Sequence, residues 1–133
     1  MKLISLLVYS ALLQAIVAAP VLSQAEVISH TRLALKAGNS KDLSRYFNDM
    51  VDVTFDGEKG SYSKVQAEFV LKDFFRRNSP IDFEYIHQGS SKEGLKYAIG
   101  RYTAQEKSFR VVVYIKQAKG NGYLVDLIDF SKE

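Results

Sequence analysis

The sequence has no cysteine and no tryptophan, and only two prolines among its 133 residues. Without cysteine the chain can form no disulfide bond, can offer no thiolate to a metal ion and has no thiol for lipid attachment. Its two histidines, His30 and His87, are far apart in the chain, so the sequence gives no basis for a zinc site. A hydrophobic core alone must hold the fold, which is feasible for a domain of about 110 residues.

The charges are nearly balanced. Eighteen lysines and arginines are scattered among fifteen acidic residues, giving a formal net charge of +3. This distribution argues against a nucleic-acid partner, because a nucleic-acid groove needs clustered basic residues. The glycine-containing segment 57–61 lacks the spacing of a nucleotide-binding loop, and we predict no cofactor.

The N-terminus has the pattern of a signal peptide. Residues 3–19 are nearly all apolar and follow Lys2. A membrane-spanning helix needs about 20 uninterrupted apolar residues, so an uncleaved anchor is the alternative we favour less. We therefore expect an exported protein, periplasmic or extracellular, with no membrane span after processing.

The cleavage site is predicted after Ser23, with cleavage after Ala25 as the alternative. Pro20 cannot readily follow a cleaved bond, which disfavours a site after Ala19. The predicted organisation is a signal peptide over residues 1–23 and a single domain over residues 24–133.

The segment from Ser61 to Pro80 predicts the central helix. Ser63 and Gln66 have the spacing of a capping box, and Pro80 prevents the helix from continuing. An apolar stripe at spacings of three and four, widened by two further rings, is expected to face a sheet. Its members are Ala67, Val70, Leu71, Phe74, Phe69 and Phe75.

The rest of the chain predicts two shorter helices and a sheet. Helices are expected over 25–37 and from Ser40 onward, followed by a hairpin with strands over 50–55 and 61–63. After Pro80 the pattern predicts a four-strand antiparallel meander. The side chains expected to face the helices are Ile81, Phe83, Tyr85, His87, Leu95, Tyr97, Ile99, Phe109, Val111, Val113 and Ile115. The facing of the last strand, 123–130, stays open because both of its alternating sets are mostly apolar.

This order of elements predicts an α+β fold in which three N-terminal helices pack on a curved, mostly antiparallel sheet that forms a cone. The segment 43–53 is similar to the junction between the second helix and first strand of the nuclear transport factor 2-like superfamily, which has a cystatin-like fold. That superfamily also contains ketosteroid isomerases and SnoaL-type cyclases.

The chain more specifically resembles an uncharacterised bacterial family of that superfamily, the domain-of-unknown-function family 4783. The resemblance covers nearly all of residues 24–133, and it rests on the segments 38–44, 62–68, 73–75, 87–92 and 97–100. The resemblance implies the fold and assigns no activity.

Two functions are compatible with these patterns. The favoured hypothesis is a non-catalytic binding module that holds a small apolar or aromatic ligand, or a protein partner, in an aromatic-lined cone pocket. The pocket residues expected are Tyr46, Phe47, Phe69, Phe74, Tyr85, His87 and Tyr97. The alternative is an isomerase, lyase or hydratase that uses His87 or Asp56 as general base. Asp56 lies close to where ketosteroid isomerases carry their base, but it also belongs to an Asp-Gly turn.

The opposite parity of the meander predicts a homodimer through the outer sheet face. That face is expected to expose too many apolar side chains for a solvated surface. They are Ile86, Ala98, Tyr102, Val112 and Tyr114.

Overall fold

The computed structural model describes residues 21–91, 96–120 and 122–133. The helices are α1 (Gln24–Ala37), α2 (Ser40–Ser44) and α3 (Lys64–Arg77). The strands are β1 (Phe47–Phe55), β2 (Glu58–Ser63), β3 (Pro80–Ser90), β4 (Lys96–Ala104), β5 (Lys107–Gln117) and β6 (Tyr123–Lys132). Within the described residues no helix is long and apolar enough to span a bilayer. The apolar run 3–19 and Leu95 lie outside them.

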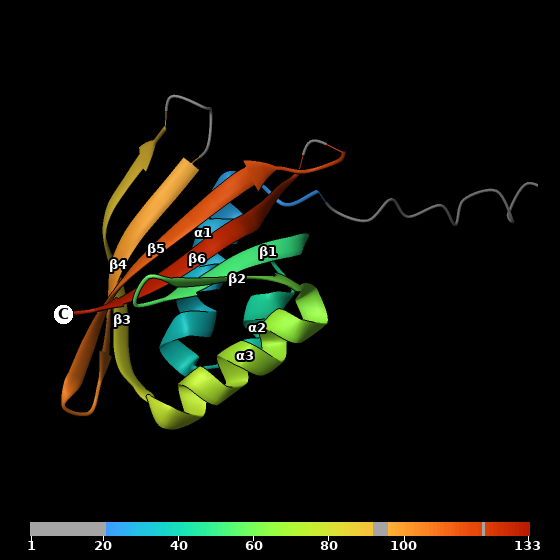
Figure 1. Cartoon of the computed structure of the whole chain (residues 1–133). Coiled ribbons are helices and arrows are strands. Elements are labelled where there is room, and N and C mark those ends of the chain that lie inside the picture. The colour runs from blue at the N-terminus through green and yellow to red at the C-terminus, as the bar shows by residue number, and fades with distance from the viewer. Residues whose placement is uncertain (1–20, 92–95, 121) are drawn as a thin grey trace, which may run out of the picture.

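The six strands form one curved sheet in the order β2-β1-β6-β5-β4-β3, and the three helices lie against its concave side (Figure 1). All neighbouring strands are antiparallel except β1 and β6, which are parallel. The predicted α+β cone and the four-strand meander are therefore confirmed.

Local capping fixes the ends of α3 as predicted. The Ser63 hydroxyl accepts the Gln66 N–H, and the Gln66 side chain accepts the Ser63 N–H, which completes the capping box. At the other end the Asn78 N–H donates to the Phe74 carbonyl (2.8 Å) before Pro80 begins β3.

Phe74 lies at the centre of the core. Its ring contacts five other aromatic rings, with centroids 4.4 to 5.9 Å away, and these belong to Phe55, Phe75, Tyr102, Phe109 and Phe130. Phe69 was wrongly predicted to join this stripe, and its side chain is 65% exposed. Two residues after Ala67, it lies about 200° around the helix from that buried position.

The predicted facing of β4 was also wrong. Ala98 and Tyr102 were expected on the outer face, but they are 1% and 0% exposed in the core. Apart from Tyr102, the inner positions of β4 hold small residues, and they are Ala98, Gly100 and Ala104. At Gly100 the Phe83 ring of β3 takes the space of a side chain, because a Cβ there would lie 2.5 Å from Cζ of Phe83. Tyr97 and Ile99 consequently face outward.

A β-bulge reverses the facing of β3 beyond Tyr85. Tyr85 pairs with Gly100, but His87, two residues later, pairs with Ile99, so one extra residue lies between them. His87 therefore lies on the outer face beside Tyr97, opposite to the prediction from strict alternation.

Leu22 and Ser23, which the sequence analysis assigned to the signal peptide, contact the domain. The Leu22 carbonyl accepts the Tyr123 N–H (3.0 Å), and the Leu22 side chain packs against the core. The Ser23 hydroxyl caps α1 by accepting the Glu26 N–H (3.1 Å). Cleavage after Ser23 would break these contacts, whereas cleavage before Val21 would keep them.

A chain that begins at Gln24 should be less stable than one that begins at Val21, because it lacks the helix cap and Leu22. Loss of the cap alone costs about 1 kcal/mol, which lowers the midpoint of thermal unfolding by about 4–8 °C for a domain of this size. Thermal unfolding of the two purified chains measures the difference. Equal midpoints would show that residues 21–23 do not stabilise the fold.

Replacing Phe74 by alanine should destabilise the protein by about 3–5 kcal/mol, because a ring in contact with five others is lost from the core. Phe69→Ala is the matched control on the same helix, and its exposed ring should change the stability by no more than about 0.5 kcal/mol. Urea unfolding measures both. Similar losses for the two variants would contradict the facing of α3.

Candidate functional site

The residues predicted to form one pocket do not line a common cavity. Phe47 and Phe74 are 0% and 4% exposed within the core. Tyr46 stacks on His30, with ring centroids 5.0 Å apart. Phe69 is exposed on α3, and Tyr85, His87 and Tyr97 lie elsewhere, as described below. Aromatic side chains thus fill the interior of the cone.

Tyr85 lies between β3 and α1, where its hydroxyl donates to the Ile28 carbonyl (3.1 Å). Burial raises the pKa of Tyr85. A hydroxyl that is already engaged by the backbone is a poor donor to a bound substrate, so Tyr85 is not a candidate for oxyanion stabilisation.

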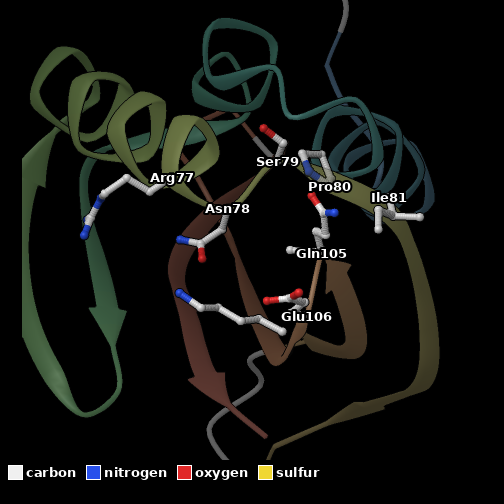
Figure 2. Close-up of a pocket in the computed structure, with 9 residues that line it drawn as sticks. Arg77, Asn78, Ser79, Pro80, Ile81, Gln105 and Glu106 are labelled. Atoms are coloured by element: carbon white, nitrogen blue, oxygen red, sulfur yellow. The ribbon is translucent and has the colours of Figure 1, made fainter.

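A hollow of about 540 Å³ opens at the end of the cone where α3 stops. Figure 2 shows it between two segments, the connection from α3 to β3 and the turn from β4 to β5. Asn78 and Ser79 border it on one side, and Gln105 and Glu106 on the other.

A second cavity of about 210 Å³ adjoins this hollow, because both are lined by Arg77, Asn78 and Lys107. Its floor consists of four core phenylalanines, and they are Phe55, Phe74, Phe109 and Phe130. Asp56 and Lys132 complete its wall. We call the two hollows together the cone mouth.

Asn78 joins the mouth to the core. It is only 9% exposed, and its side-chain amide donates to the Phe74 carbonyl (3.2 Å). The backbone carbonyl of Asn78 accepts a hydrogen bond from the Tyr102 hydroxyl. Burial raises the pKa of Tyr102, so this hydroxyl stays protonated and keeps donating. These bonds hold the end of α3 in place above the aromatic floor.

The charges at the mouth come from four separate segments. Arg77 ends α3, and its Nη2 lies 3.0 Å from Asp73 Oδ2. Arg76 shares that carboxylate through Asp73 Oδ1 at 2.8 Å. One carboxylate is thus paired with two guanidinium groups. The hydrogen bond from Arg76, together with the charge of Arg77, lowers the pKa of Asp73.

The two mouth lysines have no ion pair among the described residues. Lys107 begins β5 and Lys132 ends β6. The backbone N–H of Lys132 donates to Asp56 Oδ1 (2.6 Å), which anchors the hairpin turn at Asp56 beside β6. Asp56 was one of the two predicted catalytic residues, and it lines the smaller cavity.

His87, the other predicted catalytic residue, is far along the sheet from the mouth. Its Nε2 lies 3.4 Å from the Tyr97 hydroxyl, and its ring continues into an outer-face row with Tyr97 and Tyr114, at centroid spacings of 5.8 and 5.9 Å. Asp56 and His87 therefore belong to different surfaces.

Of the predicted dimer residues, Val112 and Tyr114 do lie on the outer face. Their neighbours in register are Ile99 and Tyr97 on β4. Ile86 is 64% exposed on β3. Where the chain is described, no group of three or more histidine, aspartate or glutamate side chains could hold a metal ion.

Sequence reasoning missed most of the mouth. Arg77, Asn78 and Lys107 were not among the residues predicted to form a site. The antiparallel meander was a usable signal, because the antiparallel pairing of β3 and β4 brings the end of α3 and the β4–β5 turn to the same end of the strands.

The fold occurs in several solved structures. The chain is 30% identical to a DUF4783 family protein from Bacteroides ovatus, with a TM-score of 0.73, over 79% of this chain and 94% of that one. It is 28% identical to a DUF4783 family protein from Bacteroides fragilis, with a TM-score of 0.72, over 78% and 96% of the two chains.

A more distant likeness shows the fold alone. An NTF2-like protein of unknown function from Shewanella baltica is 12% identical, with a TM-score of 0.61, over 82% of this chain and 90% of that chain. No curated protein matches the sequence. Residues 28–131 match the family model described as "Domain of unknown function (DUF4783)", and the chain belongs to this family.

Proposed function

We propose that this protein is a non-catalytic binding module that takes a small molecule at the cone mouth. The observation that carries the proposal is the smaller cavity, which has four phenylalanines as its floor and polar side chains as its wall. Cavities of this composition bind ligands by burying an apolar body and orienting it with a few polar groups. Other hollows exist, among them one of about 380 Å³ between α1 and β3. We favour the mouth because its smaller cavity is the one lined by phenylalanines of the core together with charged side chains.

The arrangement favours binding over the alternative of an isomerase, lyase or hydratase. Asp56 is the acid nearest the aromatic floor, but its Oδ1 already accepts the Lys132 N–H. The Tyr102 and Tyr85 hydroxyls donate to backbone carbonyls. A proton-abstracting enzyme of this fold would need a base and a donor that converge on the substrate.

Neutral aromatic probes test this proposal. We expect benzyl alcohol and 3-phenylpropionamide to shift the backbone NMR signals of residues around the mouth, such as Asn78, Lys107 and Phe130. Phe55→Ala removes a half-buried ring from the floor, and should weaken binding by about 2- to 10-fold.

Two control variants separate the mouth from other aromatic surfaces. Phe69→Ala and His87→Gln should bind the probes as the parent does, because Phe69 lies on the outer side of α3 and His87 on the outer sheet face. Probe-induced shifts that instead centre on His87 and Tyr97 would contradict the proposal, and so would unchanged binding by a folded Phe55→Ala protein.

The outer sheet face supports a second proposal, that two copies associate through it as a homodimer. Five partly buried apolar side chains are neighbours on β4, β5 and β6, and they are Tyr97, Ile99, Val112, Tyr114 and Leu127. Pairing two such faces would remove them from water, and a two-fold axis makes each patch its own partner.

Light scattering at high micromolar concentration should give the mass of a dimer. Val112→Glu should give a monomer, because it places a charge at the centre of the patch, and thermal unfolding should show that the variant still folds. Lys72→Glu, on the exposed side of α3, is the control and should remain dimeric. A monomeric parent protein would remove this proposal.

A further inference from the structure

We infer that the ligand of the cone mouth is a small organic acid, with an apolar or aromatic body and one carboxylate. This inference rests on the proposed binding function and adds the charge of the ligand. It follows from how charged side chains are distributed around the aromatic floor.

The smaller cavity has a positive surplus. Arg77, Lys107 and Lys132 line it, together with a single acid, Asp56. They come from the end of α3, the start of β5 and the end of β6, three segments that the fold brings together at one end of the strands. Neither lysine has a carboxylate partner among the described residues, and Arg77 shares Asp73 with Arg76.

The acids nearby do not cancel this surplus. Asp56 has one oxygen occupied by the Lys132 N–H, which partly compensates its charge. Glu106 lines the larger hollow and not the smaller cavity. A carboxylate positioned over the floor would therefore meet two unpaired ammonium groups and one shared guanidinium group, and charge-assisted hydrogen bonds from such groups are stronger than neutral ones.

The floor requires an apolar body. Phe74, Phe109 and Phe130 are 4%, 6% and 0% exposed, so their rings are held in the core, and Phe55, which is only partly buried, presents most of the apolar surface of the floor. A purely inorganic anion would leave this surface wet, whereas an aromatic or aliphatic acid would cover it and reach the cationic wall with its carboxylate.

Three probes with the same ring and different charge test the inference at pH 7: 3-phenylpropionate, 3-phenylpropionamide and 3-phenylpropylamine. NMR titration of the parent protein at fixed low salt should rank the acid tightest, at least about fivefold tighter than the amide, and the amine weakest. The preference for the acid should shrink as salt is added, because the lysines are exposed.

The double variant Lys107→Gln/Lys132→Gln should lose the preference for the acid and keep the affinity for the amide. Lys72→Gln makes a change of the same kind on the exposed side of α3, away from both hollows, and should keep the preference. Asp56→Asn should bind the acid more tightly than the parent does, because the single acidic side chain of the smaller cavity becomes neutral. Thermal unfolding verifies that each variant is folded.

The outcomes separate this inference from the proposed function. Equal affinities for acid and amide at the mouth, or tighter binding of the amine, would overturn the anionic ligand while leaving the binding function in place. Absence of binding of all three probes at the mouth would overturn both.

Discussion

Packing of Phe74 against the curved sheet is the contact on which the rest of the structure depends. Its ring contacts five others from α3, β1, β4, β5 and β6, so one side chain joins the central helix to most of the sheet. Close packing of this kind leaves little free space, because interiors approach the density of organic crystals. The side chains inside the cone therefore stabilise the fold. We expect a ligand to bind at the open end, the cone mouth.

The charged residues of the cone mouth lie at the ends of helices and strands and in the turns between them. Helix α3 must end in cations to suit its dipole, which places Arg77 at the opening. The β4–β5 turn needs a residue with positive φ, supplied by Glu106, and Lys107 follows at once. Asp56 likewise has positive φ in the β1–β2 turn and binds the Lys132 N–H. Ordinary turn and cap residues thus converge around the rings of the core and form a charged wall without any separate binding element.

The sequence predicts the parts of the fold that local rules determine. The capping box at Ser63 and the stop at Pro80 give α3 its ends, and alternation on β5 gives its facing, because neither depends on distant residues. The facing of β3 and β4 could not be predicted in the same way: a bulge after Tyr85 shifts His87 to the outer face, and Gly100 is inward because Phe83 covers it. The candidate site is formed by the ends of helices and strands that are distant in the sequence and meet in space, so no local sequence pattern marked its residues.

A crystal structure of the protein with 3-phenylpropionate would show directly whether the cone mouth binds an organic acid. We expect the phenyl ring to pack against Phe55 and Phe74, with the carboxylate within hydrogen-bond distance of Lys107 or Lys132. A ligand bound instead on the outer face beside His87 and Tyr97, or a mouth that stays empty at a saturating concentration, would contradict this expectation.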